Sequence, residues 1–201
     1  MTAPPRLAIR GLRCAVARWP ALDLAPGACA ALAGPSGSGK SRLLRAIADL
    51  DPNTGEAYLD GTPRAAFAGH AWRRAVVLVP ADGAWWAERV GDHLAAVEPE
   101  TLATLGFDTD VADWSVRRLS TGERSRLGLA RAVALQPRVL LLDEPTANLD
   151  DATTEAVERV VQARREAGLA AVWVTHDVGQ ARRIGAQPFT LHDGTAREAA
   201  S

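Results

Sequence analysis

A glycine-rich octapeptide constrains the fold of this chain more than any other feature of the sequence. Residues 34–41 read Gly-Pro-Ser-Gly-Ser-Gly-Lys-Ser and match the pattern G-x-x-x-x-G-K-[ST]. The preceding run Ala28–Ala33 predicts a strand, and Ser41–Leu50 has apolar residues at helical spacing. In this strand–loop–helix setting the octapeptide predicts a phosphate-binding loop in an α/β fold.

Each residue type in the loop has a chemical purpose. Small residues let the backbone approach phosphate oxygens closely, and N–H groups at the start of the following helix offset their charge. Lys40 supplies a positive charge for the β- and γ-phosphates, and the Ser41 hydroxyl is a ligand for Mg²⁺. The residues expected to bind nucleotide are Gly34, Pro35, Ser36, Gly37, Ser38, Gly39, Lys40 and Ser41.

Two carboxylates follow the apolar run Val139–Leu142. Such a run predicts a buried parallel strand, and sites in parallel sheets lie beyond the carboxyl ends of the strands. We therefore expect Asp143 beside the phosphate-binding loop, where it can hold Mg²⁺ directly or through water. Glu144 should point toward an attacking water as a general base. A solvated acidic turn is the alternative interpretation, and the phosphate-binding loop favours the functional one.

The remaining patterns alternate between strands and helices. Helical spacing over Gly122–Leu135 and Thr153–Glu166 alternates with apolar runs such as Ala170–Val174. This alternation predicts a mostly parallel sheet flanked by helices, and the turn signals at Asp60-Gly61 and Asp193-Gly194 predict an antiparallel β part. The other expected elements are strands at Leu7–Ile9, Glu56–Leu59, Ala75–Val79 and Phe189–Leu191 and a helix at Val178–Ile184.

The stretch Ala84–Arg118 has a different pattern. Tryptophans and leucines lie at helical spacing among polar residues, which predicts a short, mostly helical insert. The 201 residues fit one domain, with a catalytic core over about 1–83 and 119–201.

Composition narrows the class of protein. The net charge of −1 gives no global basic field, so we expect no nucleic acid partner. Cys14 and Cys29 show neither metal-ligand spacing nor a disulfide framework. No segment approaches the ~18 apolar residues of a membrane span, and Met1–Leu12 lacks the apolar core of a signal peptide. We expect a cytoplasmic protein that reaches the membrane only through a partner.

Several motifs, in order along the chain, resemble those of one family, the ABC (ATP-binding cassette) proteins. Besides the phosphate-binding loop and the acidic strand end, residues 119–123, Leu-Ser-Thr-Gly-Glu, resemble the signature usually written LSGGQ. Pro145–Asp150 resembles the loop that follows the acidic strand, and residues 175–177, Thr-His-Asp, resemble the switch-histidine motif. The resemblance covers about residues 7–194 and implies a P-loop NTPase of the ABC type.

The resemblance implies a mechanism shared by two copies of the chain. Two cassettes would dock head to tail, each ATP lying between the phosphate-binding loop of one and the signature of the other. Ser120 and the backbone at Gly122 would contact the γ-phosphate across this interface, and Asp150 would organise it. His176 would contact the γ-phosphate and hold the geometry in which Glu144 activates water. ATP and Mg²⁺ are the implied ligands, and hydrolysis would open the clamp.

Some positions depart from the family pattern. Ala81 falls where the family has a glutamine, and its methyl group cannot ligate Mg²⁺. Asp82 would replace that glutamine, or it would be a turn residue before Gly83. Thr121 and Glu123 replace the first glycine and the glutamine of the signature. Because a Cβ is costly at positive φ, we expect a negative φ at Thr121.

The family also stacks adenine on an aromatic residue in the loop after the first strand. The corresponding segment, Arg13–Leu22, is short here, and Trp19 is its only aromatic residue. Trp19 would either stack on the base, contributing about 1–3 kcal/mol, or pack on the sheet.

The resemblance implies a separate integral membrane permease as partner, docked on the insert. Trp85 and Trp86 are candidate anchors, with packing inside the insert as the alternative. The compact chain is similar to small bacterial cassettes of iron- or metal-export systems, and second to the haem-exporter cassette of cytochrome c maturation. Two alternatives are a soluble repair or translation ATPase and a regulatory nucleotide binder with weak turnover. The single cassette without a basic patch argues against the first. Glu144 and His176 argue against the second, although Ala81 leaves it open.

Overall fold

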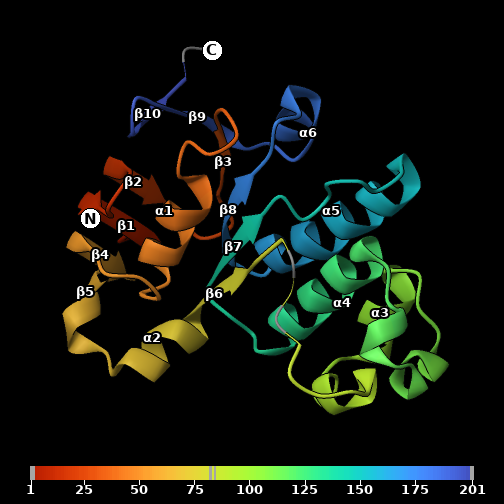
Figure 1. Cartoon of the computed structure of the whole chain (residues 1–201). Helices are drawn as coiled ribbons and strands as arrows, with labels where there is room; N and C mark the ends of the chain where they lie inside the picture. The colour runs from red at the N-terminus through yellow and green to blue at the C-terminus, as the bar shows by residue number, and fades with distance from the viewer. Residues whose placement is uncertain (1–2, 82, 84, 200–201) are drawn as a thin grey trace.

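The computed structural model describes residues 3–81, 83 and 85–199, and Figure 1 shows their arrangement. The strands are β1 Leu7–Arg13, β2 Arg18–Leu24, β3 Cys29–Ala33, β4 Thr54–Leu59, β5 Thr62–Pro63, β6 Val76–Val79, β7 Val139–Asp143, β8 Ala170–Val174, β9 Gln187–His192 and β10 Thr195–Glu198. The α-helices are α1 Lys40–Ile47, α2 Gly69–Ala75, α3 Pro99–Thr104, α4 Thr121–Ala134, α5 Asp151–Glu166 and α6 Val178–Arg183. The 3-10 helices are η1 Arg64–Ala66, η2 Val90–His93, η3 Thr109–Asp113 and η4 Val116–Arg118.

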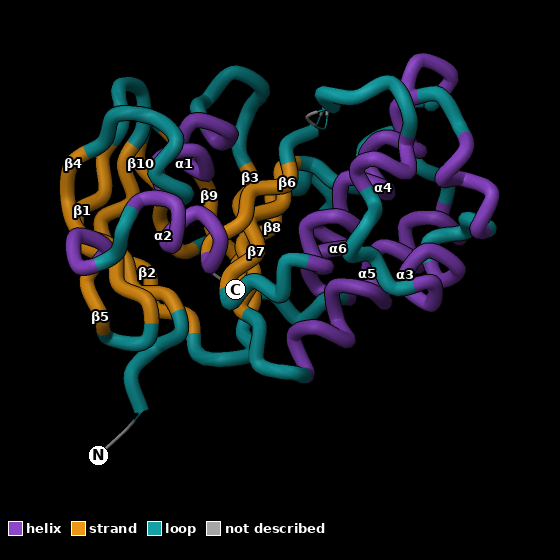
Figure 2. The backbone as a smooth tube through the Cα atoms, turned by 90° about the horizontal axis from the view of Figure 1, so that it is seen from below, coloured by secondary structure: helices purple, strands orange, loops and turns teal. Residues whose placement is uncertain are grey.

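The described strands form one mixed sheet in the order β5-β4-β1-β2-β10-β9-β3-β8-β7-β6. The five strands from β9 to β6 in this order are parallel to one another. By contrast, β4, β1 and β2 pair in antiparallel fashion. The antiparallel strands and the helices α3, α4 and α5 lie at opposite ends of the molecule (Figure 2). This arrangement confirms the α/β fold with an antiparallel part that the sequence predicts.

Two hydrophobic clusters cover the parallel strands, and β7 contributes to both. Val139 and Leu141 belong to the cluster that includes the apolar face of α1, whereas Leu140 and Leu142 belong to the one that includes α4 and α5. Successive side chains of a strand point to opposite faces, so a strand covered on both faces is apolar throughout. This explains the apolar run and leaves only the carboxyl edge for polar groups.

Most expected elements are present, but the sequence pattern does not predict β2 and α2. Pro20 interrupts the strand pattern in β2, whose exposed and buried residues do not alternate regularly. The seven-residue α2 buries only Trp72, so it has no apolar stripe to signal a helix. Both elements lie in the part of the chain that precedes the insert.

The insert is less helical than the sequence predicts. In the described part of the insert, residues 85–118, the one α-helix is the six-residue α3, and the other helical turns are η2, η3 and η4. It buries apolar residues such as Val90, Leu105 and Val111 in the cluster that contains Leu127 of α4. Ala84, the expected first residue of the insert, lies outside the described residues. The division into core and insert remains a prediction.

Candidate nucleotide-binding and hydrolytic site

The phosphate-binding loop connects β3 to α1 and needs glycine at two positions. Gly34 has a φ of 151°, and a Cβ on it would lie 2.6 Å from the carbonyl oxygen of Leu191. Gly39 caps α1 with a φ of 104°, a left-handed conformation that L side chains rarely adopt. The backbone geometry therefore requires the glycines that the sequence pattern has at these two positions.

Lys40 is held inside the loop. Its side chain is buried, and Nζ donates hydrogen bonds to the carbonyl oxygens of Gly34 at 2.8 Å and Pro35 at 3.1 Å. Nζ also lies 3.9 Å from Oε1 of Glu144. The Ser38 hydroxyl is buried and has no hydrogen-bond partner among the described residues. A phosphate oxygen would supply the acceptor that this hydroxyl lacks and a counter-charge for the ammonium group.

The two carboxylates occupy the expected place at the carboxyl end of β7. Asp143 is the last residue of the strand and is buried, and α1 packs against β7. The Ser41 hydroxyl lies in the first turn of α1. A hydroxyl and a carboxylate fit Mg²⁺, which takes oxygen ligands and usually completes its shell with water and substrate phosphates.

Glu144 has a strained backbone. Its φ is 51°, a left-handed conformation that costs a non-glycine residue about 1–3 kcal/mol. The following loop fixes this geometry, because the Ala147 N–H donates to the Glu144 carbonyl at 3.1 Å and the Ser125 hydroxyl donates to the Pro145 carbonyl at 2.9 Å. The strand ends at Asp143, and after the bend the Glu144 carboxylate lies near Nζ of Lys40 and Nε2 of His176.

His176 meets Glu144 at this edge. Its Nε2 lies 3.0 Å from Oε1 of Glu144, and both side chains are partly exposed. They line a cavity of about 330 Å³ together with Thr146, Leu149 and Gln180. The structure thus brings Lys40, Glu144 and His176 together, as the sequence predicts.

A buried polar network beneath His176 was not found by sequence reasoning. Gln180 is buried in α6, and its Nε2 donates to Oγ1 of Thr146 at 3.0 Å and to Oε1 of Glu158 at 2.9 Å. Arg183 forms two hydrogen bonds with Glu158, at 2.7 and 2.8 Å. The network therefore joins the loop after Glu144 to the helix that follows His176.

The charge state of Glu158 follows from this pairing. Burial opposes ionisation of the carboxyl group, but hydrogen bonds from Arg183 and Gln180 outweigh it, so the pKa of Glu158 lies below its usual value. The Glu158 carboxylate also raises the pKa of Arg183. No local pattern reveals these partners, because they lie 22 to 34 positions apart in the chain.

The signature-like segment begins α4 with a capping box. The exposed Ser120 accepts a hydrogen bond from the Glu123 N–H at 3.2 Å, and Oε2 of Glu123 accepts from the Ser120 N–H at 2.7 Å and its hydroxyl at 2.8 Å. Thr121 is the first helical residue and has no positive φ, as expected. A Cβ on Gly122 would lie 2.7 Å from Cδ2 of Leu149, so a side chain there would require the Leu149 side chain to shift.

Asp150 is exposed at the start of α5 and caps that helix. Its carboxylate accepts hydrogen bonds from the Thr153 N–H at 2.8 Å and the Thr153 hydroxyl at 2.9 Å. These bonds, the backbone one first, hold the pKa of Asp150 below its usual value. In this chain the carboxylate therefore has a local structural role, and its role at an interface remains a prediction.

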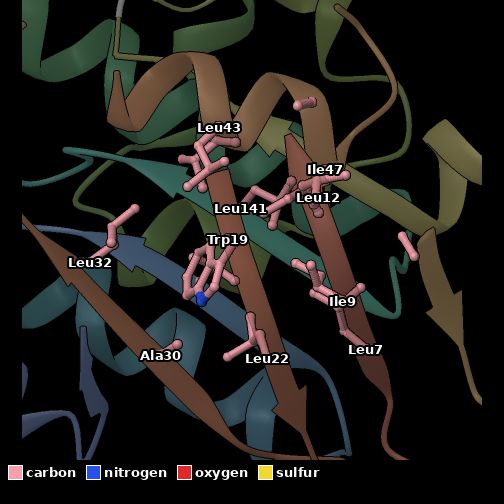
Figure 3. Close-up of a cluster of buried hydrophobic side chains, with 14 of the residues drawn as sticks. Leu7, Ile9, Leu12, Trp19, Leu22, Ala30, Leu32, Leu43, Ile47 and Leu141 are labelled. Atoms are coloured by element: carbon pink, nitrogen blue, oxygen red, sulfur yellow. The ribbon is translucent and has the colours of Figure 1, made fainter. Parts of the chain in front are cut away.

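The expectation that Trp19 could stack on adenine is wrong. Trp19 lies in β2 with no exposed surface, and its ring packs edge-to-face on Phe189 at a centroid distance of 5.1 Å. Figure 3 shows it in the cluster of buried side chains that includes Leu22, Leu32 and Leu43. A strand replaces the expected loop, and its Trp19 side chain lies on the face that packs into the core, as those of Leu22 and Leu24 do.

Only part of the segment in which the family has its glutamine lies within the described residues. Ala81 lies exposed in a turn after β6. Asp82, its expected substitute, lies outside the described residues.

A loop of the pattern G-x-x-x-x-G-K-[ST] between a strand and a helix, with an acidic strand end at the same edge of the sheet, is the arrangement of the P-loop class of nucleotide-binding proteins. Residues 20–147, more than half of the chain, match the family described as ABC transporter. The chain therefore belongs to the ABC transporter family.

Curated relatives agree with this assignment. The chain is 35% identical to the Fe(3+) ions import ATP-binding protein FbpC of Mesorhizobium japonicum, over 86% of this chain and 52% of the relative. It is 36% identical to the phosphate import ATP-binding protein PstB 2 of Natronomonas pharaonis, over 86% of this chain and 70% of the relative. It is 35% identical to the putative ABC transporter ATP-binding protein YjkB of Bacillus subtilis, over 89% of this chain and 76% of the relative. The chain spans about half the length of the FbpC relative.

The fold also has a close structural neighbour. A bacterial Atm1-family ABC exporter with ATP bound matches 98% of this chain and 40% of the exporter chain, with a TM-score of 0.82 and 22% identity. This likeness shows the fold alone. Among the described residues, no helix combines the length and the apolar character needed to cross a membrane.

Proposed function

We propose that this chain is the ATP-binding and ATP-hydrolysing subunit of an ABC transporter. Two copies close around two ATP molecules and drive a separate integral membrane permease. The observation that carries the proposal is the meeting of Lys40, Glu144 and His176 beside the phosphate-binding loop. A cation for the phosphates and a carboxylate oriented by an imidazole are the groups that hydrolysis of a phosphoanhydride needs.

The chain's own residues divide the work of hydrolysis. Loop N–H groups and Lys40 bind the phosphates and offset their charge. Mg²⁺, held by Ser41 and Asp143, would neutralise charge on the β- and γ-phosphates. Glu144 accepts a proton from the attacking water as the bond between the γ-phosphorus and the bridging oxygen breaks, which releases ADP and phosphate. His176 holds the Glu144 carboxylate in place.

The second copy completes the site. Ser120 and the N–H groups near Gly122 lie at an exposed helix start, which is accessible to the γ-phosphate of a partner. Glu123 supports this helix start through its hydrogen bonds with Ser120, and Thr121 is the first residue of the helix. Asp150 lies exposed at the start of the next helix. Because ATP would bind the closed dimer more tightly than the open one, binding shifts the equilibrium toward closure.

The permease docks in a groove between β6, the insert and α4. This cavity of about 430 Å³ is lined by Val79, Trp86, Arg131 and Leu135 among others. Trp86 is 72% exposed, whereas Trp85 is partly buried against the cluster of the insert. Trp86 is thus the anchor for the permease, and Trp85 belongs to the local core. Through this partner the chain would lie at the inner face of the membrane.

An ATPase assay of the purified chain tests the proposal, with Glu144→Gln as the control. We expect phosphate release by the wild-type protein and almost none by the variant. Equal rates would refute the enzymatic function. Capture of a permease from native membranes, lost in Trp86→Ala, tests the link to transport, and a soluble repair or translation complex in its place would refute it. The similarity to cassettes of metal-export systems remains an untested prediction.

A further inference from the structure

Two contacts join the segment that carries Glu144 to the segment that carries His176. One is the contact of 3.0 Å between these two side chains, both of which are partly exposed. The other is formed by Thr146, two positions after Glu144, whose Oγ1 accepts a hydrogen bond from Nε2 of Gln180 at 3.0 Å. Gln180 is 1% exposed and lies in the first turn of α6, just after His176. The same two segments are therefore joined once at the surface and once through a buried side chain.

The surroundings of Gln180 fix the orientation of its amide. Its Nε2 donates to Oε1 of Glu158 at 2.9 Å, and Arg183 donates to both carboxylate oxygens of Glu158. Burial opposes ionisation of Glu158, but the hydrogen bonds from Arg183 and Gln180 hold its pKa below the usual value. An ionised carboxylate only accepts hydrogen bonds, so the amide nitrogen must face Glu158. The second N–H of this nitrogen is then directed at Thr146.

The buried contact constrains the two segments more firmly than the exposed one. Water competes for exposed polar side chains, so a contact between them is weak. In the proposed reaction the Glu144 carboxylate must also accept a hydrogen bond from the attacking water. A buried, hydrogen-bonded network instead holds its members rigidly, because breaking it leaves polar groups without partners. The relative position of Glu144 and His176 therefore depends on Gln180.

We propose that Gln180 is a positioning residue that keeps the Glu144 carboxylate and the His176 imidazole in register for proton transfer from water. This inference rests on the proposed hydrolytic function. Glu158 holds the amide of Gln180 from α5, and Thr146 transfers its position to the loop that follows the general base. Binding of the phosphates is assigned to different contacts, those of the phosphate-binding loop. Loss of Gln180 should therefore slow the chemical step without weakening the binding of ATP.

Steady-state phosphate release by the full chain tests the proposal. Gln180→Met keeps the length of the side chain and removes its amide, so kcat should fall about tenfold or more. The KM for ATP should stay within about twofold of the wild-type value, because the lost contact acts on the chemical step. Thr146→Val removes the other end of the contact with little change of shape and should also lower kcat. The double variant should be no slower than the slower single variant, because both changes break the same contact.

Thr101→Val is the matched control, because Thr101 is a buried threonine of α3 whose hydroxyl accepts a hydrogen bond from Arg164 at 3.4 Å. This variant should keep the wild-type kcat, and thermal unfolding should show that each variant is folded at the assay temperature. A wild-type kcat in either folded variant, Gln180→Met or Thr146→Val, would overturn the inference and leave the proposed function standing. Multiplied losses in the double variant, or an equal loss in Thr101→Val, would overturn it too. Absence of turnover in the wild-type protein would overturn the proposed function itself.

Discussion

Nε2 of His176 lies 3.0 Å from Oε1 of Glu144, so one hydrogen bond joins the loops that follow the neighbouring strands β8 and β7. The Glu144 backbone is strained in the left-handed region, and the imidazole adds a second constraint on where its carboxylate points. A general base must lie within hydrogen-bond reach of the proton it accepts. Under the proposed function, this pair would control the transfer of a proton from the attacking water to Glu144.

His176→Ala should lower the kcat of ATP hydrolysis about a hundredfold, because a small misplacement of a catalytic group has an effect of this size. The KM for ATP should change much less, since Lys40 and the loop still bind the phosphates. Steady-state phosphate release measures both constants. His192→Ala is the control, because that side chain is exposed at the end of β9. A kcat equal to that of the wild type would contradict the assigned role of His176.

Glu144→Gln should trap an ATP-bound dimer. The amide keeps the shape of the side chain but cannot accept the proton of water, so the bridging γ-phosphate stays in place. Size-exclusion chromatography with light scattering should show dimers at saturating Mg-ATP and monomers with ADP. Monomers with Mg-ATP would count against the clamp.

Lys40→Ala should abolish nucleotide binding. It removes the buried cation that the loop holds with bonds to the carbonyls of Gly34 and Pro35. Titration calorimetry with ATP measures the effect. Arg42→Ala, an exposed cation on the same helix that pairs with Asp51, should retain binding. A wild-type titration curve for Lys40→Ala would refute the loop as the phosphate site.

The sequence predicts the site wherever local backbone chemistry decides the structure. The positive φ angles at positions 34 and 39 require glycine there. The position of Asp143 can be predicted because the strand that it ends is buried on both faces, which leaves only the carboxyl end for polar groups. These features can be read within a few residues of the chain. They were sufficient for the family, the order of most elements and the positions of the carboxylates.

Features that depend on distant contacts could not be read in this way. The family resemblance places Trp19 in a loop, and Pro20 interrupts the pattern that would predict β2. Only the contact with Phe189 shows which way the Trp19 ring points. Gln180 and Glu158 look like ordinary polar residues of two helices until α5 and α6 pack together. In both cases the decisive neighbour is far away in the sequence.

Ala81→Gln should raise the basal rate of hydrolysis if the absent side chain limits turnover. Ala81 is exposed in the turn after β6, so the longer amide has room. The amide oxygen could then ligate Mg²⁺ or hold water, which a methyl group cannot do. Steady-state phosphate release by Ala81→Gln is compared with that of Ala21→Gln, which changes an exposed residue in β2. An unchanged rate would contradict this prediction and assign the role to another group, such as Asp82.

The capping box at Ser120 and Glu123 should make stability depend on pH. The hydrogen bond from the Ser120 N–H favours the charged carboxylate and outweighs burial, so the pKa of Glu123 lies below its ordinary value of 4.5. A group with a depressed pKa stabilises the folded state above its unfolded pKa, and this contribution is lost as the pH falls through the folded pKa.

Glu123→Gln removes this charge while keeping the length of the side chain. Urea unfolding should therefore show a stability gap between wild type and variant that is constant above about pH 5 and shrinks as the pH falls below 4.5. Ser120→Ala should lose about 1 kcal/mol for the cap and should also weaken the pH dependence, because the Ser120 hydroxyl donates to the Glu123 carboxylate and helps to lower its pKa. A gap that grows on acidification would mean that Glu123 is not ionised in the capping box, and its contact with Ser120 would then need a different explanation.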